Sequence, residues 1–278
     1  MRNKIIAFAA FVELIGIPAF AAEMPLKAPP PPPAPVNSWT GFYVGANIGG
    51  GWGNGSVAYS PNDPASAVLF GFSTPPPVSF ATSGGLGGLQ FGYNYQFNQS
   101  WLVGLEADFD RSQINGFGTS GGSLTGIPIQ ATVNQTVNWF GTVRPRLGFL
   151  PTDKFLLYVT GGLAYGETNR NGNYNNSTSG TNFSVGAPSF SFSCNPNSTC
   201  FAGTSNSWAV GGTIGGGFEY AFWNNLRFKV EYLYVSLNGK LVTEPTFLFT
   251  PGTTPSSFNA NFSRNEFNVV RGGLNYQF

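Results

Sequence analysis

Strict alternation between apolar and polar residues recurs in eight segments of this chain, and it constrains the fold more than any other feature. In LQFGYNYQF, Leu89, Phe91, Tyr93, Tyr95 and Phe97 share one parity, whereas polar and small residues take the other. Because successive side chains of a β-strand point to opposite faces, each segment is expected to be a strand with one apolar face. The segments begin near Trp39, Leu89, Trp101, Trp139, Phe155, Trp208, Leu226 and Asn265.

The connections between these predicted strands alternate in length. Three are short, at 98–100, 150–154 and 222–225, and the other four span roughly 53–85, 111–131, 168–206 and 236–263. An even number of antiparallel strands with short periplasmic turns and long outer loops is typical of outer-membrane barrels. The sequence therefore predicts an all-β fold, an eight-stranded antiparallel transmembrane β-barrel with four long extracellular loops.

The composition supports a membrane barrel. Past residue 36 no run of 18 apolar residues occurs, so a membrane-spanning helix is not expected there. Only 9% of the residues are charged, against about 25% in a usual soluble domain. Closed barrels and helices are the two structures that satisfy every backbone group in lipid. The net charge of +1 gives no basic field, so nucleic acid is not an expected partner.

Residues 1–21 have the pattern of a secretory signal peptide. Arg2 and Lys4 precede a mostly apolar core that ends in an Ala-Phe-Ala motif. The alternative is a membrane helix, but the apolar run is short and is interrupted by Glu13 and Pro18. Export to the cell envelope is therefore expected.

Residues 22–37 form a proline-rich segment that contains APPPPPAPV. Consecutive prolines adopt the extended polyproline II conformation and cannot build a core. We expect a stiff periplasmic spacer ahead of the barrel domain, 38–278. A ligand for a proline-binding partner is the alternative interpretation.

Nearly all charges of the predicted strands lie on the parity that faces the barrel interior. This interior is just wide enough for its own side chains, and an unpaired buried charge is strongly unfavourable. A salt-bridged lumen is therefore expected, with the acids of the third strand beside the arginines of the fourth. The predicted lumen charges are Glu106, Asp108, Asp110, Arg144, Arg146, Glu219, Arg227, Lys229, Glu231 and Arg271.

Two alternatives use the same charges. The first is a narrow path for cations or protons through the lumen. The second is a calcium site on Glu106, Asp108 and Asp110, because three carboxylates on one strand face suit a hard cation. The neighbouring arginines already neutralise these carboxylates, so no metal site is predicted.

Cys194 and Cys200 enclose five residues in the third long connection. In an exported protein such a pair is expected to form a disulfide. The chain contains no His, which removes Ser-His-Asp triads and His-ligated haem. Neither enzymatic activity nor a cofactor is expected.

The chain ends on alternating apolar residues, Leu274, Tyr276 and Phe278. We interpret this pattern as the closing strand of the barrel. A terminal Phe after such residues also resembles the signal that is read by the outer-membrane assembly machinery. These three residues are therefore a predicted assembly signal.

Four stretches closely resemble one known family. WTGFYVGANIGGGWG (39–53), WFGTVRPRLGF (139–149), LLYVTGGLAYG (156–166) and KVEYLYVSL (229–237) are similar to segments of the alphaproteobacterial outer-membrane immunogenic proteins, a porin-like group. The resemblance covers nearly the whole chain after the signal peptide. It implies an eight-stranded outer-membrane barrel, surface exposure and, for some members, haem binding.

We therefore expect an outer-membrane β-barrel protein of a Gram-negative bacterium, with both termini in the periplasm and a structural and surface role. Its expected partners are membrane lipid, lipopolysaccharide and the assembly machinery, while host or ligand contacts through the loops stay unspecified. A porin for ions or small solutes is one alternative. A haem-binding surface protein is the other, and haem would be its cofactor.

Overall fold

The computed structural model describes residues 38–72, 75–124, 127–177, 183–187, 190–245 and 256–278. The predicted signal peptide and the proline-rich segment lie outside these residues. The elements in chain order are β1 (Gly41–Pro61), α1 (Pro64–Phe72), β2 (Val78–Gln96), β3 (Trp101–Leu124), β4 (Ile127–Thr152), β5 (Phe155–Asn176), β6 (Phe183–Ala187), β7 (Phe190–Cys194), β8 (Ser198–Ala221), β9 (Leu226–Leu237), β10 (Lys240–Pro245), β11 (Ser257–Phe262) and β12 (Asn265–Gln277).

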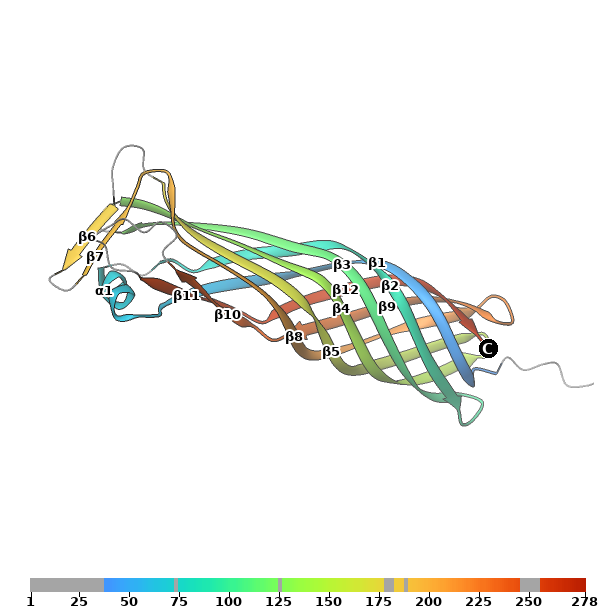
Figure 1. The fold of residues 1–278 in the computed structure, drawn as a ribbon. Helices are drawn as coiled ribbons and strands as arrows, with labels where there is room; N and C mark the ends of the chain where they lie inside the picture. The colour runs from blue at the N-terminus through green and yellow to red at the C-terminus, as the bar shows by residue number, and fades with distance from the viewer. Residues whose placement is uncertain (1–37, 73–74, 125–126, 178–182, 188–189, 246–255) are drawn as a thin grey trace, which may run out of the picture. The chain divides into compact units, whose positions relative to one another are not determined.

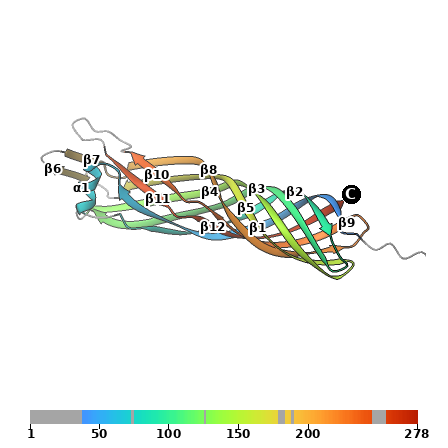
Figure 2. The same cartoon turned by 90° about the horizontal axis from the view of Figure 1, so that it is seen from below.

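Eight of the described strands form a closed antiparallel ring, which confirms the predicted fold (Figure 1). The order around the ring is β1, β2, β3, β4, β5, β8, β9 and β12, and β12 pairs with β1 to close it. We call the end with the short connections 97–100, 153–154 and 222–225 the turn end, and the C-terminus lies there too. Helix α1 and the hairpin β6–β7 lie at the opposite, far end (Figure 2).

The strands run further than the sequence pattern predicts. β3 and β4 pair as far as Leu124 and Ile127, through the predicted loop 111–131. β5 and β8 pair as far as Asn176 and Ser198, over most of the predicted loop 168–206. These strand extensions are rich in Asn, Ser and Thr, because an antiparallel sheet tolerates a solvated face beyond the membrane. They therefore lack the alternation of apolar and polar residues on which the strand prediction depends. The predicted extent of the loops is therefore wrong, although the predicted number of barrel strands is right.

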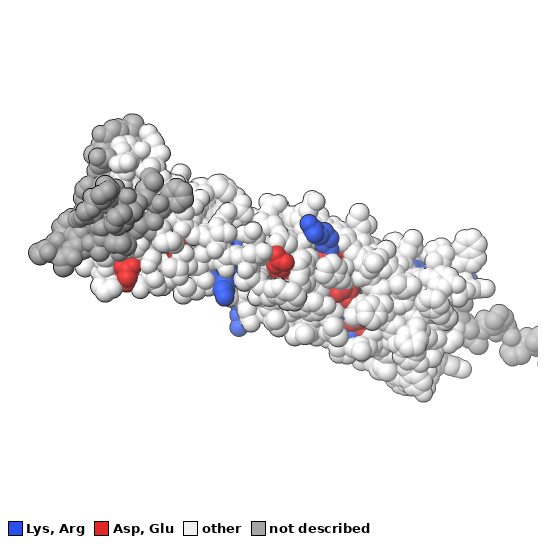
Figure 3. Space-filling model, in the orientation of Figure 1, with Lys and Arg blue, Asp and Glu red and all other residues white. Residues whose placement is uncertain are grey.

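Apolar side chains form a belt around the outside of the barrel, nearer the turn end. On β5, for example, Leu157, Val159 and Leu163 are exposed. Exposed aromatic residues border the belt: Trp101, Phe149, Tyr220 and Tyr276 toward the turn end, and Trp52, Phe109 and Trp208 toward the far end. Few charged side chains interrupt the face seen in Figure 3. Such a belt between two aromatic girdles is what a lipid-facing barrel surface requires.

Within the described residues, no helix is long and apolar enough to cross a membrane. Helix α1 has 9 residues. It packs at the far end, where Phe70 makes an edge-to-face contact with Phe258, with ring centroids 5.0 Å apart. The helix therefore covers part of the barrel end.

A charge in the middle of the apolar belt is expected to destabilise the barrel. Val159 is 62% exposed on the outer face of β5, and arginine there should cost about 2–4 kcal/mol, because the guanidinium would enter hydrocarbon. Urea unfolding in lipid vesicles measures this cost. The matched control is Gln113→Arg, at an exposed position beyond the far girdle, which should cost at most about 1 kcal/mol. Equal costs would show that the belt does not face lipid.

The interior of the barrel is filled by layers of side chains along its axis. On β4, Leu150 lies nearest the turn end, followed by Arg146 and Arg144, then Phe140, then Val133, and all five are buried. The apolar layer at the turn end is Trp39, Leu102, Leu150, Leu156, Tyr158 and Ala221. A central apolar layer above the charges includes Leu86, Ile114, Phe140, Leu233, Phe267 and Val269. A larger far-end core includes Val57, Tyr59, Val133, Tyr174, Phe201 and Phe258.

Candidate functional site

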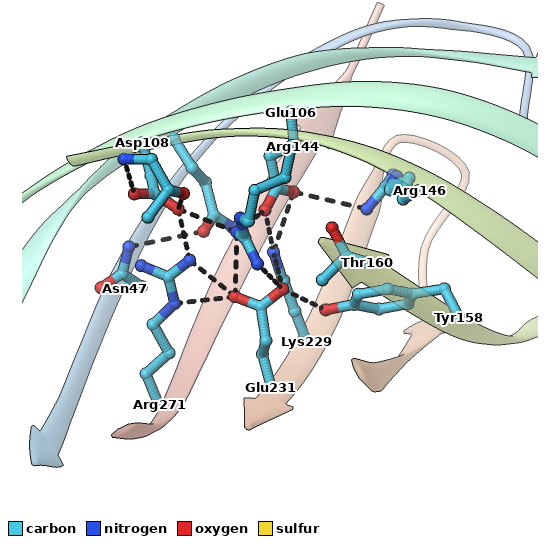
Figure 4. A network of polar contacts seen from close by, with 12 residues as sticks. Asn47, Glu106, Asp108, Arg144, Arg146, Tyr158, Thr160, Lys229, Glu231 and Arg271 are labelled. Carbon is cyan, nitrogen blue, oxygen red and sulfur yellow. Dashed lines mark hydrogen bonds and ion pairs between the residues drawn. The ribbon is translucent and has the colours of Figure 1, made fainter. Parts of the chain in front are cut away.

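The layer between the turn-end and central apolar layers holds nine of the ten predicted lumen charges. Figure 4 shows part of this layer. Glu106 on β3 lies directly opposite Arg144 on β4, and Arg144 Nη2 is 2.7 Å from Glu106 Oε1. Lys229 Nζ on β9 lies 2.6 Å from the same oxygen. Antiparallel register and the inward parity thus bring charges from three strands to one point.

Glu231 lies between two guanidinium groups at the centre of this layer (Figure 4). Arg271 Nη2 is 2.6 Å from Glu231 Oε2, and Arg144 Nη1 is 3.0 Å from Glu231 Oε1. The same Arg271 Nη2 also lies 2.6 Å from Asp108 Oδ2. These bonds tie β3, β4, β9 and β12 together across the lumen.

Asp110 differs from the prediction that the acids of β3 lie beside the arginines of β4. The register places Asp110 opposite Phe140, so no arginine of β4 faces it directly. Its Oδ2 is instead 2.5 Å from Arg271 Nη1, on β12. The spacing along β3 could not show this pairing, because it depends on which side chains meet across the barrel.

Neutral polar residues that the sequence analysis missed complete the charged layer. The hydroxyl of Tyr158 donates to Glu231 Oε1 at 2.9 Å, and that of Tyr43 donates to Glu106 Oε2 at 2.7 Å. Arg146 donates from Nε to Asn94 Oδ1 at 2.8 Å and pairs with Glu219 Oε1 at 2.6 Å. All of these residues have the inward parity of their strands, and this parity was the signal that could have found them.

Arg227 is the predicted lumen charge that stands apart. None of the described carboxylates lies in ion-pair distance of it, because it is two residues nearer the turn end than Lys229. Its guanidinium stacks on the ring of Trp39 at 4.5 Å, and its Nη2 donates to Ser38 O at 3.2 Å. Trp39 is fully buried and donates from Nε1 to Asp153 O at 3.0 Å. The residues just before β1 thus fill the mouth at the turn end.

Three carboxylates of the layer, Glu106, Asp108 and Glu231, lie close enough to share a cation, with ligand oxygens within 4.8 Å of one another. The same three groups accept hydrogen bonds from Arg144, and Lys229 Nζ lies 3.3 Å from Glu231 Oε1. These side-chain cations stand where a metal ion would have to bind. The geometry therefore suits an internal ion-pair network.

Two further charged residues are buried beyond the aromatic girdle, in segments predicted as loops. Arg170 on β5 is fully buried, and burial lowers its pKa to about 10. Glu244 on β10 is also fully buried, and burial raises its pKa to about 8. Sequence reasoning missed both, because it assigned residues 168–206 and 236–263 to loops, where no inward parity applies.

Cys194 and Cys200 form a disulfide that joins the end of β7 to the start of β8. Both cysteines belong to the far-end core. At the other end of the barrel, Leu274, Tyr276 and Phe278 point outward from the last strand and are 52%, 46% and 74% exposed. These three side chains remain available to lipid or to a partner.

Comparison with known families gives a match over residues 9–278 to the outer membrane protein beta-barrel domain. The 31 kDa outer-membrane immunogenic proteins of Brucella melitensis biotype 1 and Brucella suis biovar 1 are each 31% identical over 278 residues, which covers 99% of this chain and 100% of theirs. The 22 kDa outer membrane protein of Rhizobium leguminosarum bv. viciae is 29% identical over 79% of this chain and 71% of its own.

Among solved structures, the outer membrane protein OprG from Pseudomonas aeruginosa matches 87% of this chain and 99% of its own at 13% identity, with a TM-score of 0.45. Ail, the attachment invasion locus protein of Yersinia pestis, matches 86% of this chain and 99% of its own at 12% identity, with a TM-score of 0.34.

Proposed function

Because this chain belongs to the outer membrane protein beta-barrel domain family, we propose that its barrel is a closed structural element of the outer membrane and not a passage for solutes. The protein is a β-barrel protein of the cell outer membrane, with relatives named as outer-membrane immunogenic proteins. The charged layer is the observation that carries the proposal. Its carboxylates and cations bind one another across the lumen. In a pore, these groups would instead have to face water.

Three layers in series oppose the passage of an ion. At the turn end, Trp39 and its apolar neighbours fill the mouth. The charged layer follows, in which Arg144 is 0% exposed and Glu231 is 1% exposed. The central apolar layer packs Phe140, Phe267 and their apolar neighbours across the next stretch of the lumen, and removing an ion from water without a partner is very costly. Passage would therefore require all three layers to rearrange.

The outer surface supports a role in envelope integrity. The apolar belt anchors the barrel in lipid. The polar ends of the strands extend beyond the membrane, so the far-end connections lie outside it. Arg111 is exposed on β3, just past the girdle residue Phe109. At this height a guanidinium suits the phosphates of lipopolysaccharide. Contacts with lipopolysaccharide at the rim, and with other surfaces through the far end, are part of the proposal.

Enzymatic activity is not part of the proposed function. The carboxylate oxygens of Glu106, Asp108 and Glu231 lie within 4.8 Å of one another, and each group is held by cations of the barrel itself. A general acid or base needs access to its substrate, and these groups are at most 3% exposed. The buried position of the charges supports a structural role.

A small-solute or ion porin is the rival function, and current across a planar bilayer separates the two. The refolded full-length protein should insert without steady conductance, because its layers leave no continuous polar path. Insertion is verified in the same membranes by protease protection of the belt strands. A steady open state of the inserted protein would support the porin and reject the closed barrel.

A further inference from the structure

The barrel wall has a seam near its far end. Between β8 and β9, strand pairing ends at the pair Gly211–Leu237. Beyond it, β8 continues to Ser198 and pairs with β5 on its other side, while β10 pairs with β11. Among the described strands no ladder joins β8 to β10, and the bond from Asn238 N to Val210 O, 3.1 Å long, lies at the foot of the seam.

The two strands nevertheless lie side by side across this seam. A Cβ built on Gly203 of β8 would lie 2.5 Å from Thr243 O and 2.9 Å from Glu244 Cγ, both on β10. On β5, a Cβ on Gly172 would clash with the Glu244 carboxylate. The two glycines therefore leave the space into which the Glu244 side chain folds, and side-chain packing replaces backbone hydrogen bonds at the seam.

The Glu244 side chain is an anomaly at this position. It is 0% exposed, and neither carboxylate oxygen has a hydrogen-bond partner among the described residues. The hydroxyls of Tyr59 and Tyr174, in the adjoining far-end core, are also buried without a described partner. An ionised carboxylate in such surroundings would be very unfavourable, whereas a neutral carboxylic acid is tolerated.

The groups that face Glu244 from the neighbouring elements do not compensate its charge. β1 contributes Tyr59, and β5 contributes Tyr174 and, one step toward the belt, Arg170. Burial sets the pKa of Glu244 at about 8, and no cation acts to lower it. β8 and β11 face it with uncharged residues, among them Gly203 and Phe258. Burial also raises the pKa of both tyrosines, so neither titrates before Glu244.

We propose that Glu244 is a proton-dependent latch that holds the hairpin β10–β11 against β8 at the far end of the barrel. In its neutral form the side chain packs against Gly172 and Gly203 and closes the seam. When it loses its proton, the carboxylate must reach water, and β10 separates from β8. The separated strands expose the edges of β8 and β10, each with unpaired backbone groups that can accept another strand.

The direction of the pH effect follows from linkage. A glutamate is half protonated near pH 4.5 in an exposed state and near pH 8 in the closed latch. Between these values the closed state binds more protons than the open state, so the closed state loses stability as pH rises. The opening equilibrium should therefore increase about tenfold per pH unit below pH 8 and level off above it.

Hydrogen exchange of the full-length barrel in detergent micelles tests the latch. In 199–210 and 241–245, the backbone amides that do not bond β5 or β11 point into the seam, and their protection is measured from pH 5 to pH 9 and corrected for the intrinsic exchange rate. In the wild type, protection of these seam-facing amides should fall about tenfold per pH unit up to about pH 8. The amides of β9 and β12 in the belt should keep a constant protection.

Two variants locate the effect. Glu244→Gln keeps the shape of the side chain and cannot ionise, so its protection should not change between pH 5 and pH 9. Glu266→Gln is the matched control, because Glu266 is exposed on β12, and it should keep the wild-type slope. The latch would be overturned if amide protection in the wild type did not change with pH. It would also be overturned if protection in Glu244→Gln fell with pH as steeply as in the wild type.

Discussion

Replacement of Arg271 by methionine is expected to destabilise the folded barrel by about 3–5 kcal/mol, because it leaves buried carboxylates without their cation. Arg271 lies 2.5 Å from Asp110 and 2.6 Å from both Asp108 and Glu231. Methionine nearly preserves the volume of the aliphatic stem, so the loss is mainly electrostatic. Few other single substitutions in the barrel remove as many bonds.

Urea unfolding of the refolded protein in lipid vesicles measures this loss. Arg264→Met is the matched control, because Arg264 is exposed between β11 and β12 and should change stability by less than about 0.5 kcal/mol. A second variant, Arg271→Lys, should lose less stability than Arg271→Met, since lysine keeps the charge but not the bidentate geometry of the guanidinium. Equal stability of the wild type and Arg271→Met would show that the ion pairs contribute nothing.

Replacement of Phe278 by alanine is expected to lower the amount of folded barrel in the outer membrane severalfold, with little effect on refolding in vitro. The Phe278 side chain is 74% exposed, so its removal costs the folded state little packing. Its backbone N–H donates to Phe42 O at 3.0 Å, and this bond remains in the variant. The loss would therefore report recognition during assembly, which we propose for Leu274, Tyr276 and Phe278.

The assembly prediction is checked by comparing heat-modifiable folded protein in outer-membrane fractions with refolding yield in detergent. Phe222→Ala is the control, because Phe222 is an exposed aromatic residue, 47% accessible, in a turn at the same end of the barrel. It should assemble like the wild type. Equal assembly of both variants would contradict a role for Phe278 as a signal.

The belt of the barrel could be predicted from the sequence because lipid imposes a strong alternation there. Outward residues such as Leu157 and Val159 must be apolar, so parity revealed the strands and placed charges such as Glu106 inside. Beyond the girdle the outer face of the barrel wall meets water, and the inner face meets a core of apolar and polar residues. The alternation weakens in stretches such as 168–176, and the sequence pattern therefore suggested loops where β5 continues.

The partners within the charged layer could not be predicted in the same way. The strand parity predicts that the side chains of Asp110 and Arg227 point inward. It does not predict which residue each side chain contacts across the lumen. Asp110 reaches Arg271, while Arg227 turns toward Trp39. The burial of Glu244 was also beyond reach, since it depends on two glycines from strands distant in sequence, Gly172 and Gly203.

Single-channel recording tests the closed lumen most directly. The wild type is recorded beside Arg144→Ala and Glu106→Ala, which each break the bond between β3 and β4 across the charged layer. The wild type should insert and stay silent, and brief openings should appear in the variants, because water can enter where the ion pairs are lost. Steady conductance of the wild type, with ion selectivity altered by the same substitutions, would contradict the account and make these charges the lining of a pore.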